Sequence, residues 1–474
     1  MNFEATIGLE IHVEMKTKSK MFSTSPVTFG ELPNTMIAPL DMAFPGTLPV
    51  VNKQAVIDAI RVCNALHMSI DDLLIFDRKN YFYSDLPKGY QITQQDHPIG
   101  REGYLCIDVE GHEKRINIER LHMEEDTCKQ LHSWDCTLLD YNRAGIPLIE
   151  IVSKPEMTTG EEARKYAEKI RSIVSFLDVS DGKMEEGSLR CDVNISIKPI
   201  GSKVFGTKVE IKNLNSFVNI EKAIDFEIKR QTEVLLSGGK VIQETRRFDE
   251  ATKETVTMRL KTDSVDYKYF TEPNIVPIRL SKEFIESAIK SSPELAEEKM
   301  ARYQSLGLNE YDSRLLVANK DNAEYFDDLV KKGANAKMAA NWVIVDIQAI
   351  LNKNEISIKD FIVSTDNLAK LLKNIEQGKI SNNQAREIFA KMQVDNKDCE
   401  ELIAASGTNL ISDEAVIHQM VVELIDNNPQ AVIDYKNGKT RAVGYLVGLI
   451  MKATKGKINP SITNKMIVEE LNKR

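Results

Sequence analysis

The chain opens with a regular alternation of apolar and polar positions over "IGLEIHVEMK", residues 7–16. Apolar side chains at every second position, from Ile7 to Val13, predict a β-strand with one buried face. Similar patterns predict further strands at 104–109, 115–122, 147–152, 189–197 and 207–212. The first 290 or so residues are therefore expected to be rich in strands.

Helical periodicity interrupts these strands and then takes over. Residues 158–177 and 215–239 each show an amphipathic pattern, with Thr159 as N-cap of the first and Gly238-Gly239 ending the second. From about Lys282 onward the pattern is helical throughout, with Ser381 as a further N-cap. We therefore expect an α+β fold with a strand-rich mixed domain (1–292), a helical domain (293–408) and a helical tail domain (409–474).

The polar faces of several predicted strands carry Glu, Asp, His or Asn where Thr, Lys or Ser is more usual. The residues concerned are Glu10, His12, Asp192, Asn194 and Glu210, and residues 122–126 have the sequence "HMEED". Glu150 also lies inside an apolar strand. These faces are either simply solvated or they converge. Converging carboxylates repel by roughly 4 kcal/mol per pair at 4 Å and an effective dielectric near 20, so they need a cation or shared protons. Oxygen ligands with one imidazole favour Mg²⁺ or Mn²⁺.

Composition narrows the function classes. The chain has 474 residues, a net charge of −9, and six cysteines with no CxxC pair, so neither a disulfide framework nor a closed zinc site is indicated. No apolar run approaches the roughly 20 residues needed to cross a bilayer, and the N-terminus lacks the features of a secretory signal, so we expect a cytoplasmic protein without a membrane partner. The GxxxxGK[ST], GxGxxG, HExxH and GxSxG motifs are absent.

Two stretches combine features that suit nucleic acid. Residues 431–474 hold nine Lys/Arg and three Asp/Glu, which fits either a phosphate backbone or a solvated helical surface. Residues 76–100 interleave Arg78, Lys79 and Lys88 with aromatic residues. That stretch fits either stacking on a nucleotide or RNA end, or cross-strand packing in a hairpin.

Six long motifs occur in order: "IGLEIHVEMKTKSKMFS", "FDRKNYFYSDLPKGYQITQ", "RLHMEEDTCK", "MEEGSLRCDVNISI", "KVEIKNLNSF" and "QETRRFDEATKETVTMRLKTDSVDYKYFTEPNIVP". Together they resemble the GatB family, the B subunits of bacterial tRNA-dependent amidotransferases (GatCAB), and the resemblance covers essentially the whole chain. It implies a cradle domain followed by helical and YqeY-like tail domains.

The resemblance also implies an activity. ATP and Mg²⁺ would phosphorylate the side-chain carboxylate of Glu-tRNA(Gln), Asp-tRNA(Asn) or both. Ammonia, released from glutamine by an amidase subunit (GatA) and channelled to the cradle, would then displace the phosphate. A small subunit (GatC) would complete a heterotrimer. The alternative is a non-catalytic subunit that binds and positions tRNA.

Matching the family's motifs to this sequence gives candidate residues. The resemblance implies Glu10, His12, Glu125 and Glu210 as the catalytic Mg²⁺ neighbourhood. Phosphate and nucleotide contacts are expected from Lys79, Lys208, Asp192 and Asn194. The tail is expected to bind tRNA through its basic residues, which are Lys436, Lys439, Arg441, Lys452, Lys455 and Lys457. The role of Glu14 stays open.

The chain departs from the family pattern at one place. Some relatives carry cysteine pairs that resemble a zinc site in the segment before "PGxLPVxN". Residues 22–52 contain no cysteine here, so we expect no structural zinc and a segment held by packing alone.

Overall fold

The computed structural model describes residues 2–260, 266–405, 414–436, 439, 441–454, 458 and 460–474. The chain divides into two compact units, residues 1–295 and 296–474. We call the first unit the cradle and describe each unit by itself.

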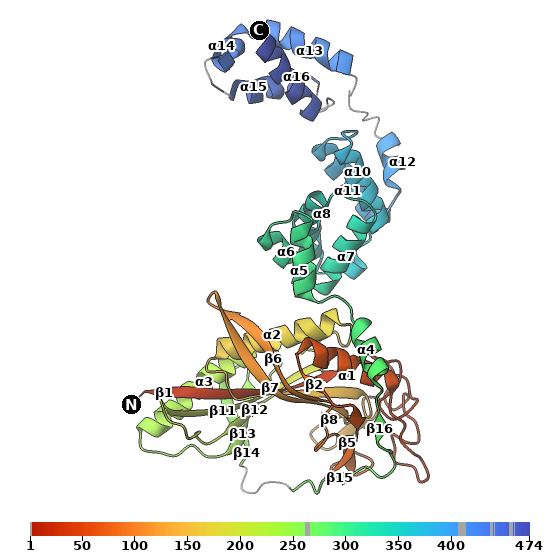
Figure 1. Ribbon diagram of the computed structural model, residues 1–474, viewed down its shortest axis with the longest axis vertical. Helices are drawn as coiled ribbons and strands as arrows, with labels where there is room; N and C mark the ends of the chain where they lie inside the picture. The colour runs from red at the N-terminus through yellow and green to blue at the C-terminus, as the bar shows by residue number, and fades with distance from the viewer. Residues whose placement is uncertain are drawn as a thin grey trace. The chain divides into compact units, whose positions relative to one another are not determined.

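A nine-stranded sheet forms the centre of the cradle (Figure 1). Its strand order is β14-β13-β12-β11-β1-β10-β7-β6-β2. In that order the strands are Glu254–Leu260, Glu244–Asp249, Val209–Lys212, Leu189–Pro199, Phe3–Glu14, Pro147–Ser153, His112–Glu125, Gly100–Val109 and Ser69–Ile70. Neighbouring strands pair antiparallel except β12 and β13, which are parallel.

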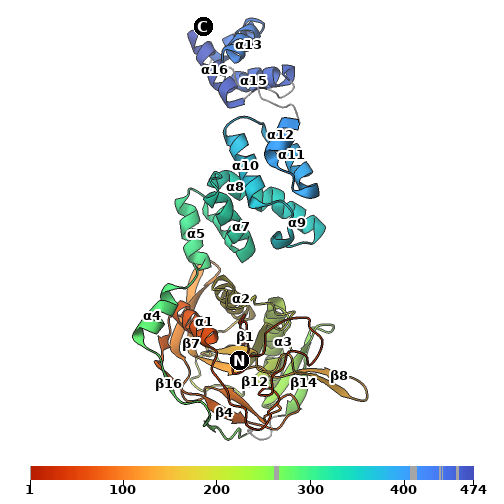
Figure 2. The same ribbon diagram turned by 90° about the vertical axis from the view of Figure 1, so that its right-hand side faces the viewer.

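Helices α1 (Lys53–Ala65), α2 (Gly160–Phe176) and α3 (Phe217–Leu236) lie on one side of this sheet (Figures 1 and 2). The N-cap of α2 is Thr159, as predicted; its side chain accepts a hydrogen bond from the Glu162 amide. The apolar members of β1, such as Leu9 and Ile11, are fully buried in the core on this side. Each such side chain contributes about 1.5–3 kcal/mol by leaving water. The polar side chains of β1 therefore lie on the opposite face of the sheet.

Short strands complete the cradle. Strand β4 (Asp77–Asn80) pairs with β5 (Tyr90–Thr93) and β15 (Phe270–Thr271), and β3 (Leu73–Leu74) pairs with β16 (Ile278–Arg279). Strand β8 (Lys129–His132) pairs with β9 (Thr137–Asp140), and β8 projects from the cradle in Figure 2. Helix α4 (Lys282–Lys290) ends this unit.

The cysteine-free segment 22–52 is held by more than packing. The ammonium of Lys20, whose side chain is completely buried, donates to Asp41 Oδ2 at 3.1 Å and to the Tyr141 carbonyl at 3.4 Å. Further along, the Asn34 side chain donates to the Leu139 carbonyl. The expectation of packing alone was therefore wrong, because a buried ion pair and side-chain hydrogen bonds also fix this segment.

The second unit is helical. Its elements are α5 (Ala296–Ser305), α6 (Glu310–Val317), α7 (Lys320–Lys331), α8 (Ala336–Asn341), a π-helical turn (Trp342–Ile347), α9 (Gln348–Asn354), a 3₁₀ turn (Ile358–Asp360), α10 (Thr365–Glu376), α11 (Asn382–Asp395), α12 (Cys399–Ala405), α13 (Glu414–Asp426), α14 (Pro429–Lys436), α15 (Arg441–Ala453) and α16 (Pro460–Lys473). Ser381 caps α11, as the sequence predicted, and it forms a capping box with Gln384. Helices α13–α16 share an apolar core around Leu446, Ile450 and Leu471.

The α+β fold class is confirmed, with a strand-rich cradle followed by helices. The boundary at 408/409 falls on residues 406–413, which lie outside the described residues, so the division of the second unit stays a prediction. Within the described part of the chain, no helix has both the length and the apolar character needed to span a membrane.

Candidate functional site

The strand pairing places the acidic residues of distant segments side by side on the polar face of the sheet. Residue by residue, Glu10 of β1 lies opposite Asp192 of β11, and His12 lies opposite Glu150 of β10. Because side chains alternate between faces, these residues point away from the helices while Ile11 points into the core. The converging arrangement, one of the two possibilities that the sequence left open, is the one that the chain adopts.

Two groups of carboxylates result, and we call them group A and group B. Group A is His12, Glu124 and Glu150, and group B is Glu10, Asp192 and Glu210. Within each group, one ligand atom from every residue lies within 4.8 Å of the others. The sequence predicted one neighbourhood, whereas the described residues form two.

In group A the imidazole of His12 lies between two carboxylates. Its Nε2 is 3.7 Å from Glu124 Oε1 and 3.6 Å from Glu150 Oε2. The buried His122 Nε2 lies 3.0 Å from the same Glu150 oxygen. Burial alone would lower the pKa of His122, but the Glu150 and Glu124 carboxylates raise it to about 9. The two carboxylates therefore favour the protonated form of His122, whose charge offsets part of theirs.

Lys79 faces group A from the small β4–β5 sheet. Its ammonium lies 4.9 Å from the centre of the Tyr267 ring. Burial would lower the pKa of Lys79, but the Glu124 and Glu150 carboxylates outweigh it and raise the pKa. A protonated lysine beside group A could reach a phosphoryl oxygen there.

Group B is held by hydrogen bonds from three directions. The Asn194 amide donates to Glu10 Oε1 at 2.8 Å, and the Thr245 hydroxyl donates to Glu210 Oε2 at 2.8 Å. The Lys212 ammonium pairs with Asp192 and lies 3.3 Å from Glu210 Oε1. Burial, and next the charge of Glu150, raise the pKa of Glu10. Smaller contributions in the same direction come from the charges of Asp192 and Glu210.

Both groups fit a divalent cation. Their donors are carboxylate oxygens, with a single imidazole in group A, and they come from strands whose register fixes their spacing. A bound cation would offset the repulsion among the carboxylates of each group.

A cavity of about 610 Å³ lies beside these groups. Its lining includes His12, Asp192 and Lys212, together with Arg190, Glu185 and Glu186. The cavity therefore joins part of group A to part of group B and adds charged side chains of both signs. Its volume suits a ligand of nucleotide size.

Glu125 belongs to neither group. Its neighbour Glu124 points to the polar face, so the alternation of β7 directs Glu125 elsewhere. Its carboxylate pairs with the Lys88 ammonium at 2.5 and 2.6 Å and accepts a hydrogen bond from the Ile92 amide at 3.0 Å. Lys88 also lines a separate cavity of about 250 Å³ with Phe44 and Tyr90. The structure does not bring Glu125 together with Glu10, His12 or Glu210.

Glu14, whose role the sequence left open, also lies outside both groups. It faces the buried Asp126 and lies 3.9 Å from the Arg190 guanidinium. Burial and the Asp126 carboxylate raise the pKa of Glu14 to about 8. The guanidinium of Arg190 pairs with Asp126 at 2.6 Å. This end of β1 is thus an ion-pair cluster.

The remaining predicted cradle residues divide in two. Asp192 and Asn194 lie in and beside group B, as described above. Lys208 is exposed and precedes the first residue of β12. Glu124 and Glu150, which complete group A, were not among the cation ligands predicted from the sequence. The signal for Glu150 was a carboxylate within an apolar strand, but only the register with His12 shows its partner.

The basic tail residues are at the surface where the structure describes them. Lys436, Lys439, Arg441 and Lys452 are exposed. Lys439 pairs with Asp434 at 3.1 Å, and Lys436 donates to the Arg474 carbonyl. Lys455 and Lys457 lie outside the described residues.

Comparison with known proteins decides the family. Residues 5–286 match the GatB/GatE catalytic domain, and residues 324–471 match the GatB domain called Yqey. The chain belongs to the GatB family. A protein of Bacillus cereus (strain AH187), named as the B subunit of an aspartyl/glutamyl-tRNA(Asn/Gln) amidotransferase, is 50% identical over 475 residues, covering 100% of both chains. Proteins of the same name from Bacillus cytotoxicus and Bacillus licheniformis are each 50% identical over 476 residues, again over 100% of both chains.

These findings confirm the family that the sequence motifs indicated, and with it the role of an amidotransferase B subunit, an enzyme of the ligase type. The matched catalytic domain spans the strands that carry group A and group B. The roles of individual residues are not given by family membership and are treated as proposals below.

Proposed function

We propose that this chain uses ATP to activate the side-chain carboxylate of Glu-tRNA(Gln), Asp-tRNA(Asn) or both, and then joins it to ammonia. The observation that carries this proposal is the convergence of group A and group B, whose donors suit a divalent cation, beside a cavity of about 610 Å³. Relatives at 50% identity are named for aspartyl and glutamyl tRNA substrates. We place the reaction in the cytoplasm, where translation consumes its product.

The chemistry requires activation because a carboxylate has no good leaving group. Transfer of the γ-phosphoryl group of ATP to the carboxylate oxygen gives an acyl phosphate and ADP. Ammonia then attacks the acyl carbon, the amide C–N bond forms, phosphate departs with the C–O bonding pair, and a proton is released. The protein positions the reactants and neutralises charge, and does not itself become covalently modified.

Particular residues suit these tasks. Group A and group B would hold Mg²⁺, which when bound neutralises phosphoryl charge. Lys79 directs a protonated amine at group A, and Lys212 and Arg190 line the cavity with positive charge. These side chains can bind and orient the phosphates of a nucleotide. Lys208, exposed at the start of β12, is a further candidate for phosphate contact.

We further propose that ammonia is supplied by an amidase subunit, GatA, with GatC as a third chain. The relatives are each named as one subunit of an amidotransferase, which supports an assembly with other chains. We propose that the Lys88–Glu125 pair acts beside the 250 Å³ cavity on the ammonia side of the reaction, and not as a cation ligand.

The tail is proposed to bind the tRNA backbone. One exposed side of α15 carries Arg441, Tyr445 and Lys452, with Gly444 and Gly448 between them. Because the two glycines have no side chains and no other atoms lie close to them, a sugar-phosphate backbone could approach the helix and its two cations closely. Lys436 and Lys439 precede this helix and add charge.

Hydroxylamine trapping tests the activation step. The assembled complex is given misacylated tRNA, ATP and hydroxylamine without glutamine, and the aminoacyl hydroxamate is measured. The wild type should form hydroxamate in an ATP-dependent manner, and Asp192→Asn should not, while both bind tRNA equally. If the chain were instead a non-catalytic scaffold, Asp192→Asn would leave hydroxamate formation unchanged.

A further inference from the structure

A hydrogen bond outside the carboxylate ligands fixes one member of group B. The hydroxyl of Thr245, 2% exposed, donates to Glu210 Oε2 at 2.8 Å. The other oxygen of Glu210 faces Lys212 at 3.3 Å. The carboxylate is therefore oriented by a donor on each side, and its rotation would break a buried hydrogen bond.

The position of Thr245 follows from an unusual strand arrangement. Strand β12 has four residues and pairs in parallel with β13, so that Glu210 lies opposite Thr245 on one side and Asn194 of β11 on the other. Asn194 in turn donates to Glu10. The register of three neighbouring strands thus places Thr245 beside Glu210, next to group B.

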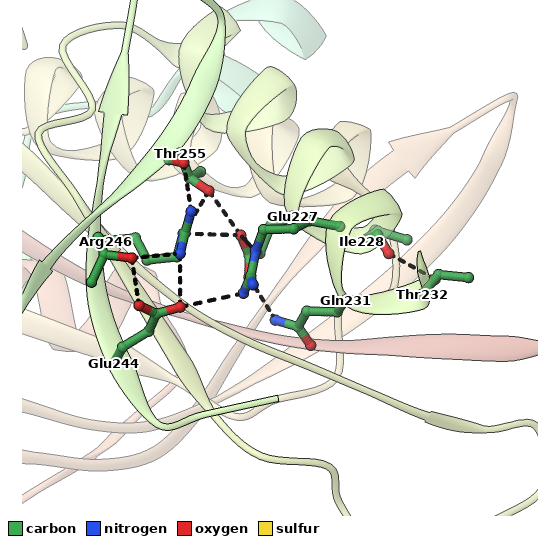
Figure 3. Close-up of polar contacts among 9 residues, drawn as sticks. Glu227, Ile228, Gln231, Thr232, Glu244, Arg246 and Thr255 are labelled. Carbon is green, nitrogen blue, oxygen red and sulfur yellow. Dashed lines mark hydrogen bonds and ion pairs between the residues drawn. The ribbon is translucent and has the colours of Figure 1, made fainter. Parts of the chain in front are cut away.

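The residues flanking Thr245 point to the opposite face of the sheet and are anchored there (Figure 3). The Arg246 guanidinium donates to Glu244 Oε1 at 2.7 Å, to the Thr255 hydroxyl at 2.8 Å and to the Thr255 carbonyl at 2.6 Å. The Thr257 hydroxyl of β14 donates to Glu244 Oε2 at 2.7 Å. Three consecutive residues, 244–246, are thereby held from both faces.

The anchor on helix α3 is Glu227, whose side chain is completely buried. Its carboxylate accepts hydrogen bonds from Arg230 at 3.0 Å, from Gln231 at 2.9 Å and from the Thr255 hydroxyl at 2.9 Å. Figure 3 shows Glu227, Glu244 and Arg246 converging between the helix and the strands. We call this set of contacts the β13 anchor.

A buried ionic network of this kind adds little net stability compared with apolar packing, but it specifies one arrangement. Here the arrangement that it specifies is the place of β13, and therefore of the Thr245 hydroxyl. Supporting donors of this type orient metal ligands in proteins, and their loss commonly weakens metal binding about 10- to 100-fold.

We propose that Thr245 is a positioning residue for the group B cation site and that the β13 anchor, through Arg246, sets its place. The inference rests on the proposed cation site and adds residues that touch neither cation nor substrate. Thr245 acts through Glu210, and Arg246 acts through Thr245.

Manganese binding tests the proposal without relying on activity. Free Mn²⁺ is titrated by electron paramagnetic resonance against the full chain, and the sites lost in Asp192→Asn are assigned to group B. Thr245→Val, which keeps the shape and removes the donor, should weaken those sites about tenfold. Thr245→Ser keeps the donor and should bind as the wild type does.

Two further variants complete the design. Thr232→Val is the matched control, because the Thr232 hydroxyl donates to the Ile228 carbonyl within α3 at 2.7 Å, apart from the β13 anchor; it should leave Mn²⁺ binding unchanged. Arg246→Lys should weaken Mn²⁺ binding at group B, although Arg246 lies on the opposite face of the sheet, because it loosens the strand that carries Thr245. Thermal unfolding confirms that each variant is folded.

The measurements distinguish the existence of the group B cation site from the positioning role of Thr245. If the wild type binds Mn²⁺ and Asp192→Asn removes sites, but Thr245→Val binds normally, the positioning role is refuted while the cation site stands. Equal weakening in Thr245→Ser and Thr245→Val would also refute it, because the donor would then be irrelevant. Wild-type protein without Mn²⁺ sites at group B would refute the cation site and the positioning role together.

Discussion

The polar sheet face of the cradle and the exposed side of α15 in the tail carry charge in opposite ways. In the cradle, acids are buried or half-buried and each is fixed by strand register and by named donors, as Glu10 is by Asn194. In the tail, cations such as Arg441 and Lys452 are exposed on a helix surface. Buried and oriented charges can stabilise charge that develops during a reaction. Exposed cations instead favour salt-dependent binding to a polyanion.

The comparison teaches that catalysis and tRNA affinity should be separable by mutation. Variants in the cradle groups should lower turnover without changing the affinity for tRNA. Variants on α15 should lower affinity and its salt dependence without changing turnover at saturating tRNA.

The largest effect is expected from Glu150→Gln. This carboxylate faces both His12 and His122, so its neutralisation removes a group A ligand and the partner of a buried imidazolium. Amidation by the assembled complex should fall by about 10²–10³-fold. The glutaminase rate and the tRNA dissociation constant are the controls and should not move. Amidation at the wild-type rate would show that group A is not needed for catalysis.

Glu125→Gln should affect stability more than metal binding. It leaves the Lys88 ammonium, 10% exposed, without its charged partner. Breaking a buried pair of this kind costs about 3 kcal/mol in the free energy of unfolding, which denaturant titration of the purified chain measures. Mn²⁺ affinity should stay at the wild-type value. A loss of Mn²⁺ sites would instead support Glu125 as a ligand, as the sequence suggested.

The tail is tested by replacing Lys436, Arg441 and Lys452 together with Ala. The slope of log affinity against log salt should become shallower by about 2 to 3, with tRNA binding about 10- to 100-fold weaker near physiological salt. The matched control replaces three exposed lysines that precede the tail, which are Lys337 of α8, Lys379 between α10 and α11, and Lys391 of α11. Equal losses in both triple variants would mean that tRNA responds to net charge and not to α15.

The smallest effect is expected from Tyr166→Phe in α2, on the helical side of the sheet. The Tyr166 hydroxyl is buried and has no hydrogen-bond partner among the described residues. Removing it should raise the free energy of unfolding by about 1 kcal/mol, because an unsatisfied polar group leaves the core. Turnover and tRNA affinity should both be unchanged. Marked destabilisation would show that the hydroxyl is satisfied in solution.

The elements were predictable because their signals are local. Period-two alternation located β1 and β11, and the caps Thr159 and Ser381 mark helix starts that the structure confirms. Strand register was not predictable, because it depends on pairing between segments more than 100 residues apart. Register is what brings Glu150 to His12, so group A could not be assembled from sequence alone.

The choice of Glu125 over Glu124 shows the same limit at the scale of one residue. Both carboxylates stand in "HMEED", and a one-residue step along a strand moves a side chain to the other face. Lys88 was noted only as one base among aromatic residues, and Thr245 was not noted at all. The contact of each depends on a partner supplied by another strand, which is Glu125 for Lys88 and Glu210 for Thr245.

If group A and group B each hold a divalent cation, crystals of this chain soaked in Mn²⁺ will show it by anomalous diffraction. We expect one peak bounded by His12, Glu124 and Glu150 and another bounded by Glu10, Asp192 and Glu210. Mn²⁺ ordered only elsewhere, or no ordered Mn²⁺ on this face at saturating concentration, would show that the polar face of the sheet does not bind cations in these two places.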